Sequence, residues 1–308
     1  MSYLGNLTLR LAAGAMRLPE PVLRRHAEFL AAGQNPDGGF SGREGPSDLY
    51  YTGFALRGLA LSAGLNEEIA ARAAGFLRSR LEAPLSSIDF LSLVFSAVLL
   101  EAAAGVDVFH LAGLDRKQAV ADATARFRRE DGGYAKTERS GQSSTYHTFL
   151  VAACLQLVDA PIPEPPKIER LVRLRQRPDG GFVELDGLDR SGTNPTAAAV
   201  GLLRLLDAVE EPTRTASAKF LAGMQNAEGG LRAHTRIPAA DLLSTFAGLT
   251  ALADLDALSA VDTATARRYL DSLALPDGGF RGGAWDDRAD LEYTFYGLGV
   301  LALLATSP

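Results

Sequence analysis

The sequence predicts an all-α protein, an (α/α)6 toroid in which six inner helices are surrounded by six outer helices. Three observations predict this fold: a glycine turn that recurs at a regular spacing, a pair of helical patterns between successive turns, and a contrast in hydrophobicity within each pair. We expect one domain over residues 1–308, with an N-terminal helix at about residues 1–18 leading into six repeats. The expected repeats span 19–64, 65–105, 106–160, 161–210, 211–258 and 259–308.

The turn is written Asp-Gly-Gly or Glu-Gly-Gly before a Phe, Tyr or Leu, and its first glycines are Gly38, Gly132, Gly180, Gly229 and Gly278. These glycines are 94, 48, 49 and 49 residues apart. Because the first gap is almost twice the others, a repeat without the glycines is expected within it, over residues 66–105. Glycine at a helix end adopts positive φ without a side-chain penalty. We therefore interpret the turn as structural rather than catalytic.

Each repeat contains an amphipathic pattern followed by a pattern that is apolar on nearly every face. Residues 21–34 and 50–64 show the two patterns in the first repeat. A helix with one apolar stripe lies at a surface, whereas a helix that is apolar all round is buried. An open solenoid is the alternative, but it would need polar terminal repeats, and the last helical pattern, at 294–308, is as apolar as the others. This favours closure into a ring.

Composition limits the possible functions. The chain is 47% hydrophobic and 22% charged, with a net charge of −6 and no basic run, which argues against nucleic acid as a partner. The single cysteine, Cys154, excludes an internal disulfide framework and a site of several thiolates. The N-terminus does not have the pattern of a signal peptide, and no uninterrupted apolar run is long enough to predict a membrane span. We expect a cytoplasmic protein.

The recurrent turn and the inner helices that open on Asp with Thr four residues later resemble the β subunits of protein prenyltransferases. They resemble squalene and terpene cyclases more distantly. Residues 23–42 are similar to the opening of a Rab geranylgeranyltransferase β subunit. The resemblance implies an isoprenoid diphosphate in a central apolar cavity, transfer of the prenyl group to an acceptor, and a helical-repeat α subunit as a possible partner.

The resemblance also implies a zinc site, built from Asp-x-Cys in one inner helix and a His in the next. In this sequence Asp241 matches the aspartate, but Leu243 stands at the cysteine position and Tyr293 at the histidine position. Leucine cannot bind a metal and neutral tyrosine is a poor substitute for imidazole. We therefore predict no metal ligands and disfavour zinc. Asp89 and His147 come from adjacent repeats and imitate two of the three ligands, which is weak evidence for a site.

If the six inner helices run parallel, their N-termini gather at one end of the ring and favour anions such as diphosphate. The candidate catalytic residues at this end are Asp48, Asp241 and Tyr293. The aspartates have an alternative interpretation as helix N-caps, which Asp favours. The candidate substrate-binding residues are Arg43, Arg139, Arg236, Tyr51, His147, Trp285 and Tyr296. Arginine binds two phosphate oxygens at once, and the aromatic residues indicate an apolar pocket.

The sequence leaves three functions open. The first is a prenyltransferase-like enzyme that works without the usual zinc site. The second is a terpene-cyclase-like enzyme in which a cavity Asp protonates an alkene, although the Asp-x-Asp-Asp signature is absent. The third is a non-catalytic toroid that binds lipid or serves as a scaffold.

Overall fold

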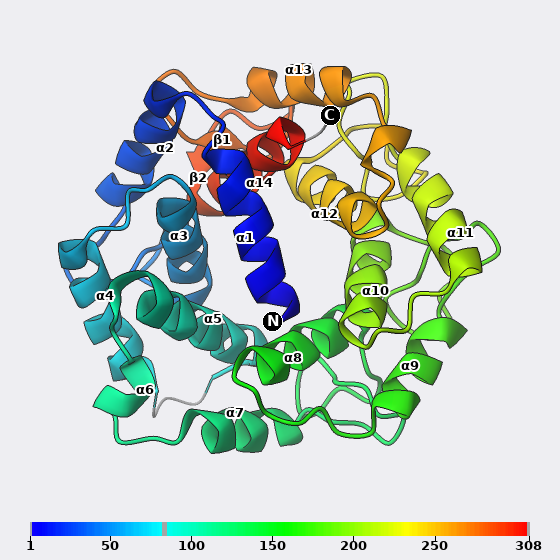
Figure 1. Cartoon of the computed structure of the whole chain (residues 1–308), viewed down its shortest axis with the longest axis horizontal. Coiled ribbons are helices and arrows are strands. Elements are labelled where there is room, and N and C mark those ends of the chain that lie inside the picture. The colour runs from blue at the N-terminus through cyan, green and yellow to red at the C-terminus, as the bar shows by residue number, and fades with distance from the viewer. Residues whose placement is uncertain (1, 82–84, 307–308) are drawn as a thin grey trace.

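A computed structural model describes residues 2–81 and 85–306, whose regular secondary structure is almost all helix. Figure 1 shows the helices of this part of the chain as two concentric rings. The inner ring consists of α3 (Leu49–Leu61), α5 (Ser87–Ala104), α8 (Thr145–Leu157), α10 (Thr193–Leu205), α12 (Leu242–Asp254) and α14 (Leu291–Ala305). The outer ring consists of α2 (Glu20–Ala32), α4 (Glu67–Arg80), α7 (Arg116–Ala125), α9 (Pro165–Leu174), α11 (Glu211–Ala222) and α13 (Thr263–Leu273). The predicted all-α toroid is confirmed.

Short elements complete the rings. Helix α6 (Val108–Leu111) and a 3-10 turn (Leu258–Ala260) lie in connections between the rings, and β1 (Phe280–Arg281) pairs antiparallel with β2 (Ala289–Asp290). Each inner helix packs against the next, and α14 packs against α3. The last repeat is thus joined to the first, and the ring is closed rather than an open solenoid.

The seam between the last and first repeats has its own contacts. The backbone N–H of Gly279 donates to Nδ1 of His26 at 3.0 Å, and the imidazole stacks on Phe280 with ring centroids 4.5 Å apart. Arg43 forms two hydrogen bonds with Asp286 across the same seam, at 2.9 and 2.5 Å. These contacts join parts of the chain that are far apart in sequence.

The glycine turns hold each repeat against its neighbour. At Gly180 φ is +89°, and a Cβ there would lie 2.3 Å from the backbone oxygen of Ala216 in the outer helix of the next repeat. Only glycine permits both this conformation and this approach. The turn aspartate Asp179 accepts hydrogen bonds from the Gly181 N–H and the Ser191 hydroxyl. The carboxyl group of the turn is therefore used to hold the turn itself.

A threonine in the first turn of the inner helix connects it to the glycine turn of the same repeat. The backbone N–H of the residue after the two glycines donates to the threonine Oγ1, and the bonds are Phe40 to Thr52, Tyr134 to Thr148, Phe182 to Thr196, Leu231 to Thr245 and Phe280 to Thr294. The second repeat has no glycine turn, and Phe90 stands at its threonine position. This contact explains why the turn and the threonine recur together.

Helix α1 (Tyr3–Ala15) crosses the C-terminal end of the inner ring, as Figure 1 shows. It packs closely against α14, where a Cβ on Gly14 would lie 2.0 Å from the Ala302 backbone oxygen. Its first turn is fixed by Asp254, which accepts from the Tyr3 hydroxyl at 2.6 Å and from Arg10 at 2.8 Å. Helix α1 therefore closes this end of the ring, while the N-termini of the inner helices form the opposite end.

Helix α5 has the length and apolar composition of a membrane-spanning helix, with 18 residues and a mean hydropathy of 1.8. In the described part of the chain it stands in the inner ring and packs against α3, α4 and α8. A core helix of a ring satisfies the same two criteria, so its position accounts for its composition.

Candidate active site at the N-terminal end of the ring

Three inner helices begin with an aspartate that acts as an N-cap. The side chains of Asp48, Asp241 and Asp290 accept hydrogen bonds from the backbone N–H groups of Tyr51 at 2.7 Å, Ser244 at 2.7 Å and Tyr293 at 2.9 Å. Burial raises the pKa of all three carboxyl groups. The structure thus gives Asp48 and Asp241, the predicted catalytic aspartates, a capping role.

The other three inner helices begin with uncharged residues. Ser86 and Ser144 cap α5 and α8, and Gly192 precedes α10 without a side-chain hydrogen bond to the helix. The positive ends of these helix dipoles are therefore not neutralised by a capping carboxylate. The half of this end at α3, α12 and α14 is capped by carboxylates, and we call it the acidic half. In the other half, Asp89 lies in the first turn of α5, and Glu184 Oε1 accepts from the Tyr146 N–H in the first turn of α8.

The second residue of each inner helix is at least partly exposed, and these residues are Tyr50, Ile88, Tyr146, Asn194, Leu243 and Glu292. Glu292 is the carboxylic acid of this set. Its Oε1 accepts hydrogen bonds from the Tyr50 hydroxyl at 2.7 Å and the Tyr296 hydroxyl at 3.2 Å. Burial raises the pKa of Glu292, although the two hydroxyl groups oppose the shift. This network joins α14 to α3.

A cluster of four buried aromatic rings lies beside Glu292. Phe54, Phe246, Phe295 and Tyr296 have ring centroids between 5.2 and 5.8 Å apart. They come from α3, α12 and α14, the acidic half of the ring. Tyr296, a predicted substrate-binding residue, belongs to both this cluster and the Glu292 network.

Arg57 extends from α3 into the aromatic cluster. Its guanidinium carbon lies 4.3 Å from the centroid of Phe54 and 4.6 Å from that of Phe295. Its Nε donates to the Gly53 carbonyl at 2.9 Å, and no carboxylate of the described residues lies within ion-pair distance of it. Burial lowers the pKa of Arg57, but a guanidinium keeps its charge. The cluster therefore contains an unpaired cation.

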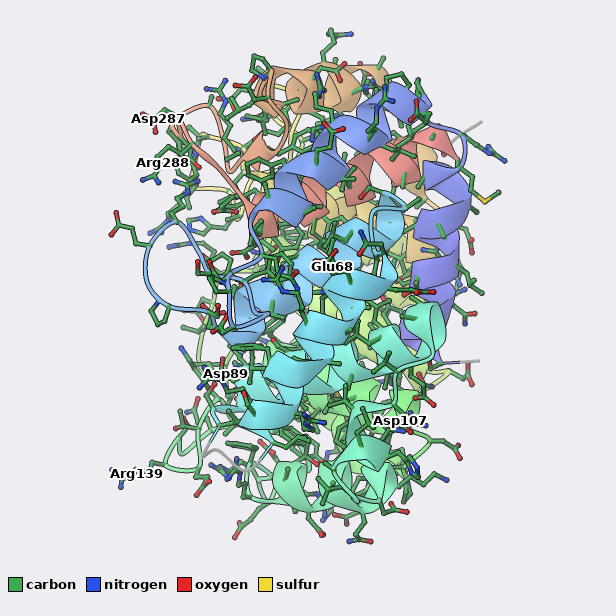
Figure 2. All side chains as sticks on the ribbon, turned by 90° about the vertical axis from the view of Figure 1, so that its left-hand side faces the viewer. Glu68, Asp89, Asp107, Arg139, Asp287 and Arg288 are labelled. Carbon is green, nitrogen blue, oxygen red and sulfur yellow. The ribbon has the colours of Figure 1, made fainter. Side chains whose placement is uncertain are left out.

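The predicted arginines occupy different environments. Arg43 is held by Asp286 and lies 3.3 Å from Asp290, so its charge is already compensated. Arg139 and Arg236 are exposed. Figure 2 shows Arg139 on the same edge of the molecule as Asp89 and Arg288, opposite the end that α1 closes.

The predicted aromatic residues also lie in different places. Trp285 is 64% exposed in a loop. Tyr51 packs beside Gly42, and its ring meets that of Tyr50 edge to face at 5.4 Å. The structure brings Tyr296 and Tyr50 together at Glu292, but it gives Trp285 no place in that network.

His147 is buried in the first turn of α8. The Ser144 hydroxyl donates to Glu184, so the Nδ1–H of His147 donates to Ser144 Oγ, at 2.9 Å. Burial lowers the pKa of His147 to about 4, which leaves the ring neutral at pH 7. Its Nε2 is buried without a hydrogen-bond partner among the described residues. The side chain is therefore oriented by a hydrogen-bonded chain that includes Glu184.

The residues at the zinc-like positions do not fit a metal. Asp241 caps α12, Leu243 has no donor atom, and burial raises the pKa of Tyr293 to about 12. Among the described residues, no three His, Cys, Asp or Glu side chains are grouped as metal ligands. Cys154 is fully buried and burial raises the pKa of its thiol, so it is not a reactive thiolate.

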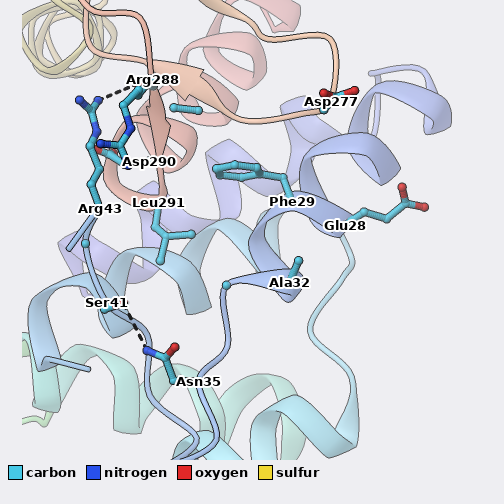
Figure 3. Close-up of a pocket in the computed structure, with 13 residues that line it drawn as sticks. Glu28, Phe29, Ala32, Asn35, Ser41, Arg43, Asp277, Arg288, Asp290 and Leu291 are labelled. Atoms are coloured by element: carbon cyan, nitrogen blue, oxygen red, sulfur yellow. Dashed lines mark hydrogen bonds and ion pairs between the residues drawn. The ribbon is translucent and has the colours of Figure 1, made fainter. Parts of the chain in front are cut away.

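Two pockets of the described residues do not include the aromatic cluster. One of about 590 Å³ opens at the seam between the first and last repeats, where Phe29, Ala32 and Leu291 form its apolar wall (Figure 3). A second, of about 570 Å³, lies beside α1 and is lined by Tyr3, Arg10, Arg204 and Asp254, among others. Neither pocket contains Arg57 or Glu292.

The family model described as the prenyltransferase alpha-alpha toroid domain matches residues 21–73 and 196–307. The chain belongs to this family. No curated protein sequence matches the chain.

Several solved structures share the fold of this family member. A protein geranylgeranyltransferase-I of Candida albicans in complex with GGPP is 14% identical with a TM-score of 0.72, and the match covers 92% of this chain and 91% of that one. A type II terpene cyclase, MstE, from Scytonema is 15% identical with a TM-score of 0.60, and the match covers 98% of both chains. A protein from Actinoplanes is 19% identical with a TM-score of 0.60, over 94% of this chain and 100% of that one. The resemblance to the prenyltransferase and terpene cyclase toroids is confirmed.

Proposed function

We propose that this chain binds an isoprenoid diphosphate at the N-terminal end of the ring and transfers the prenyl group to an acceptor without zinc. The observation that carries the proposal is Arg57, an unpaired guanidinium inside a cluster of aromatic rings. A ligand that pairs with the guanidinium and also packs against the aromatic rings has an anionic head and an apolar chain. An isoprenoid diphosphate has this chemistry, and the GGPP complex of the similar Candida albicans enzyme supports the choice.

The charges around Arg57 favour the same ligand. The N-termini of α5, α8 and α10, which no aspartate caps, lie at the same end of the ring, and helix N-termini attract phosphate groups. Arg139 and Arg236 add exposed positive charge near the same end, whereas Arg43 is compensated by Asp286. During transfer, negative charge develops on the leaving diphosphate, and a positioned guanidinium stabilises that charge.

The charge of Arg57 argues against a protonation-initiated cyclase. Such an enzyme moves a carbocation along its substrate, and aromatic faces stabilise that cation. Here the faces of Phe54 and Phe295 are already occupied by a fixed cation. A substrate carbocation over the same faces would be repelled by the Arg57 guanidinium, because charges interact strongly in a buried site. Prenyl transfer is therefore the better-supported reaction.

The test is calorimetric titration of the purified chain with farnesyl and geranylgeranyl diphosphate, with and without zinc, together with an assay of diphosphate release. Arg57→Met should weaken binding by about ten- to a hundredfold, because a charged hydrogen bond to the head group is lost. Arg78→Met, in an exposed position of α4, should bind as the wild type does.

Each alternative gives a distinct result in this test. An affinity unchanged by Arg57→Met, or no binding of either diphosphate, would contradict the proposal. Binding without diphosphate release would support a non-catalytic lipid-binding toroid. Cyclised products without diphosphate release would support a terpene-cyclase-like enzyme.

A further inference from the structure

We infer that Glu292 is the base that receives the acceptor's proton, and that the acceptor is a small phenol. This inference rests on the proposed function, because it names the second substrate of the same site. Because the zinc-like positions hold no suitable ligands, a prenyl transfer here would have no metal-bound thiolate, and another group must activate the acceptor.

The position of the carboxyl group supports this role. Oε1 of Glu292 is fixed by the hydroxyl groups of Tyr50 and Tyr296. Oε2 accepts no hydrogen bond from the described residues and is free to take a proton. The two tyrosine hydroxyls fix the carboxyl group while leaving one oxygen available, which is the arrangement that a general base requires.

The charged and titratable groups around Glu292 come from three inner helices. They are Tyr50, Tyr51 and Arg57 from α3, Tyr146 from α8, and Tyr293 and Tyr296 from α14 together with its N-cap Asp290. Helix α12 contributes the uncharged side chains Leu243 and Phe246. Arg57 favours the carboxylate form of Glu292, and Asp290 opposes it. Arg57 therefore influences the proposed base as well as the proposed diphosphate.

The reaction balances without a further reagent. The C1–O bond of the prenyl diphosphate breaks, and its electron pair leaves with the diphosphate. A phenol oxygen or ring carbon forms the new bond to C1, and the proton that it carried passes to Glu292. Solvent then takes the proton from the carboxyl group, so that the products are a prenylated phenol, diphosphate and one proton, which the diphosphate can take up from solvent.

The strength of the base selects the acceptor class. A thiol reacts as its thiolate, and a carboxylate is far too weak a base to ionise a thiol with a pKa of about 8.5 before the reaction. A phenol attacks as the neutral molecule and becomes strongly acidic only as the new bond forms. A flat aromatic ring also packs well among Phe54, Phe246 and Phe295. The site therefore suits a phenol better than a cysteine.

The experiment offers tritiated geranylgeranyl diphosphate to the whole chain with 1-naphthol, with a cysteine-containing peptide, or with water alone. We expect prenylated naphthol. Glu292→Gln should slow its formation at least a hundredfold, while geranylgeranyl diphosphate binds within about threefold of the wild-type affinity. Glu292→Asp should restore part of the rate. Glu101→Gln, which alters a partly buried carboxyl near the other end of an inner helix, is the control and should transfer as the wild type does.

The pH profile separates a base from a structural residue. The wild-type rate should rise with pH as the Glu292 carboxyl ionises, and Glu292→Gln should lack this rise. Tyr50→Phe keeps the ring but removes a hydrogen bond that stabilises the carboxylate, so the rise should move to higher pH. Circular dichroism of each variant checks the fold, and Tyr50→Phe gives the decisive profile if Glu292→Gln does not fold.

Three results would overturn the assignment: transfer by Glu292→Gln at the wild-type rate, prenylation of the peptide in preference to naphthol, or bound geranylgeranyl diphosphate that yields neither prenylated naphthol nor the free alcohol. Failure of the wild type to bind geranylgeranyl diphosphate would instead refute the proposed function itself.

Discussion

At the scale of single residues, the carboxyl groups at the N-terminal end of the ring are of two kinds. Asp48, Asp241 and Asp290 accept hydrogen bonds from backbone N–H groups of the helices that they begin. Glu292 lies two residues into its helix and accepts from tyrosine hydroxyls on α3 and α14. A cap stabilises its own helix, whereas the Glu292 carboxyl joins two helices through tyrosine hydroxyl groups.

This distinction gives a prediction at Asp241. Asparagine caps helices as well as aspartate does, so Asp241→Asn should have nearly the wild-type free energy of unfolding. Asp241→Ala should lose about 1 kcal/mol, measured by urea denaturation. Both variants should release diphosphate at the wild-type rate once folded. Loss of turnover in a stable Asp241→Asn protein would instead give Asp241 the catalytic role predicted from the sequence.

The residues that sequence reasoning missed had visible signals. Arg57 is the one charged residue in the apolar segment 49–61, and an ionisable group in a buried helix asks for a function. Glu292 lies at the position that aligns with Leu243, between Asp290 and Tyr293, which the register did identify. The resemblance to a zinc site directed attention to the positions on either side of it. Which of these side chains meet depends on side-chain direction within a helix turn, and periodicity does not give that direction.

At the scale of elements, the glycine turn and the inner-helix threonine form one unit of contact in five repeats. The repeat spacing, the helix pairs and closure of the ring were all predictable, because they depend on local patterns that recur. The position of α1 was not predictable, because it depends on single contacts such as Asp254 with Tyr3 and Arg10. Those contacts join segments about 250 residues apart and leave no periodic signal.

A matched pair of substitutions tests the close packing of the turn. Gly180→Ala meets the Ala216 backbone oxygen at 2.3 Å, so the outer helix of the next repeat must move. Gly187 also has positive φ, +77°, but a Cβ there meets nothing within 4 Å. We expect Gly187→Ala to cost about 1 kcal/mol and Gly180→Ala to cost several times more, measured by urea denaturation. Equal losses would show that conformation alone, and not the contact between repeats, requires the glycine.

At the scale of the whole molecule, closure of the ring depends on the seam at His26. The imidazole of His26 is fully buried, and this burial lowers its pKa to about 4. As a neutral side chain it accepts the Gly279 N–H through Nδ1. Protonation at Nδ1 would remove this acceptor and place a charge in the seam. The join between first and last repeats is therefore sensitive to acid.

The sign of the effect follows from linkage. Between pH 6.5 and 4 the unfolded chain protonates His26 and the folded chain does not, so the free energy of unfolding falls as the pH falls through this range. The full contribution of His26 is about 3 kcal/mol. His147 shifts in the same direction, and the buried carboxyl groups with raised pKa oppose both.

A variant isolates the seam from these other groups. His26→Gln retains an acceptor for the Gly279 N–H but does not titrate. Urea unfolding of both proteins from pH 7 to pH 4 should show the wild type losing about 3 kcal/mol more than His26→Gln. Parallel curves for the two proteins would mean that His26 does not control the acid sensitivity of the seam.

Helix α1 has a consequence for the order of events. Because α1 crosses the C-terminal end of the ring, we expect the ligands of the proposed reaction to enter at the end where the inner helices begin. The ligand that binds deeper must then bind first and leave last, because the second ligand covers it. In the proposed reaction, the bound acceptor would therefore shield the reactive prenyl group from water without a moving lid.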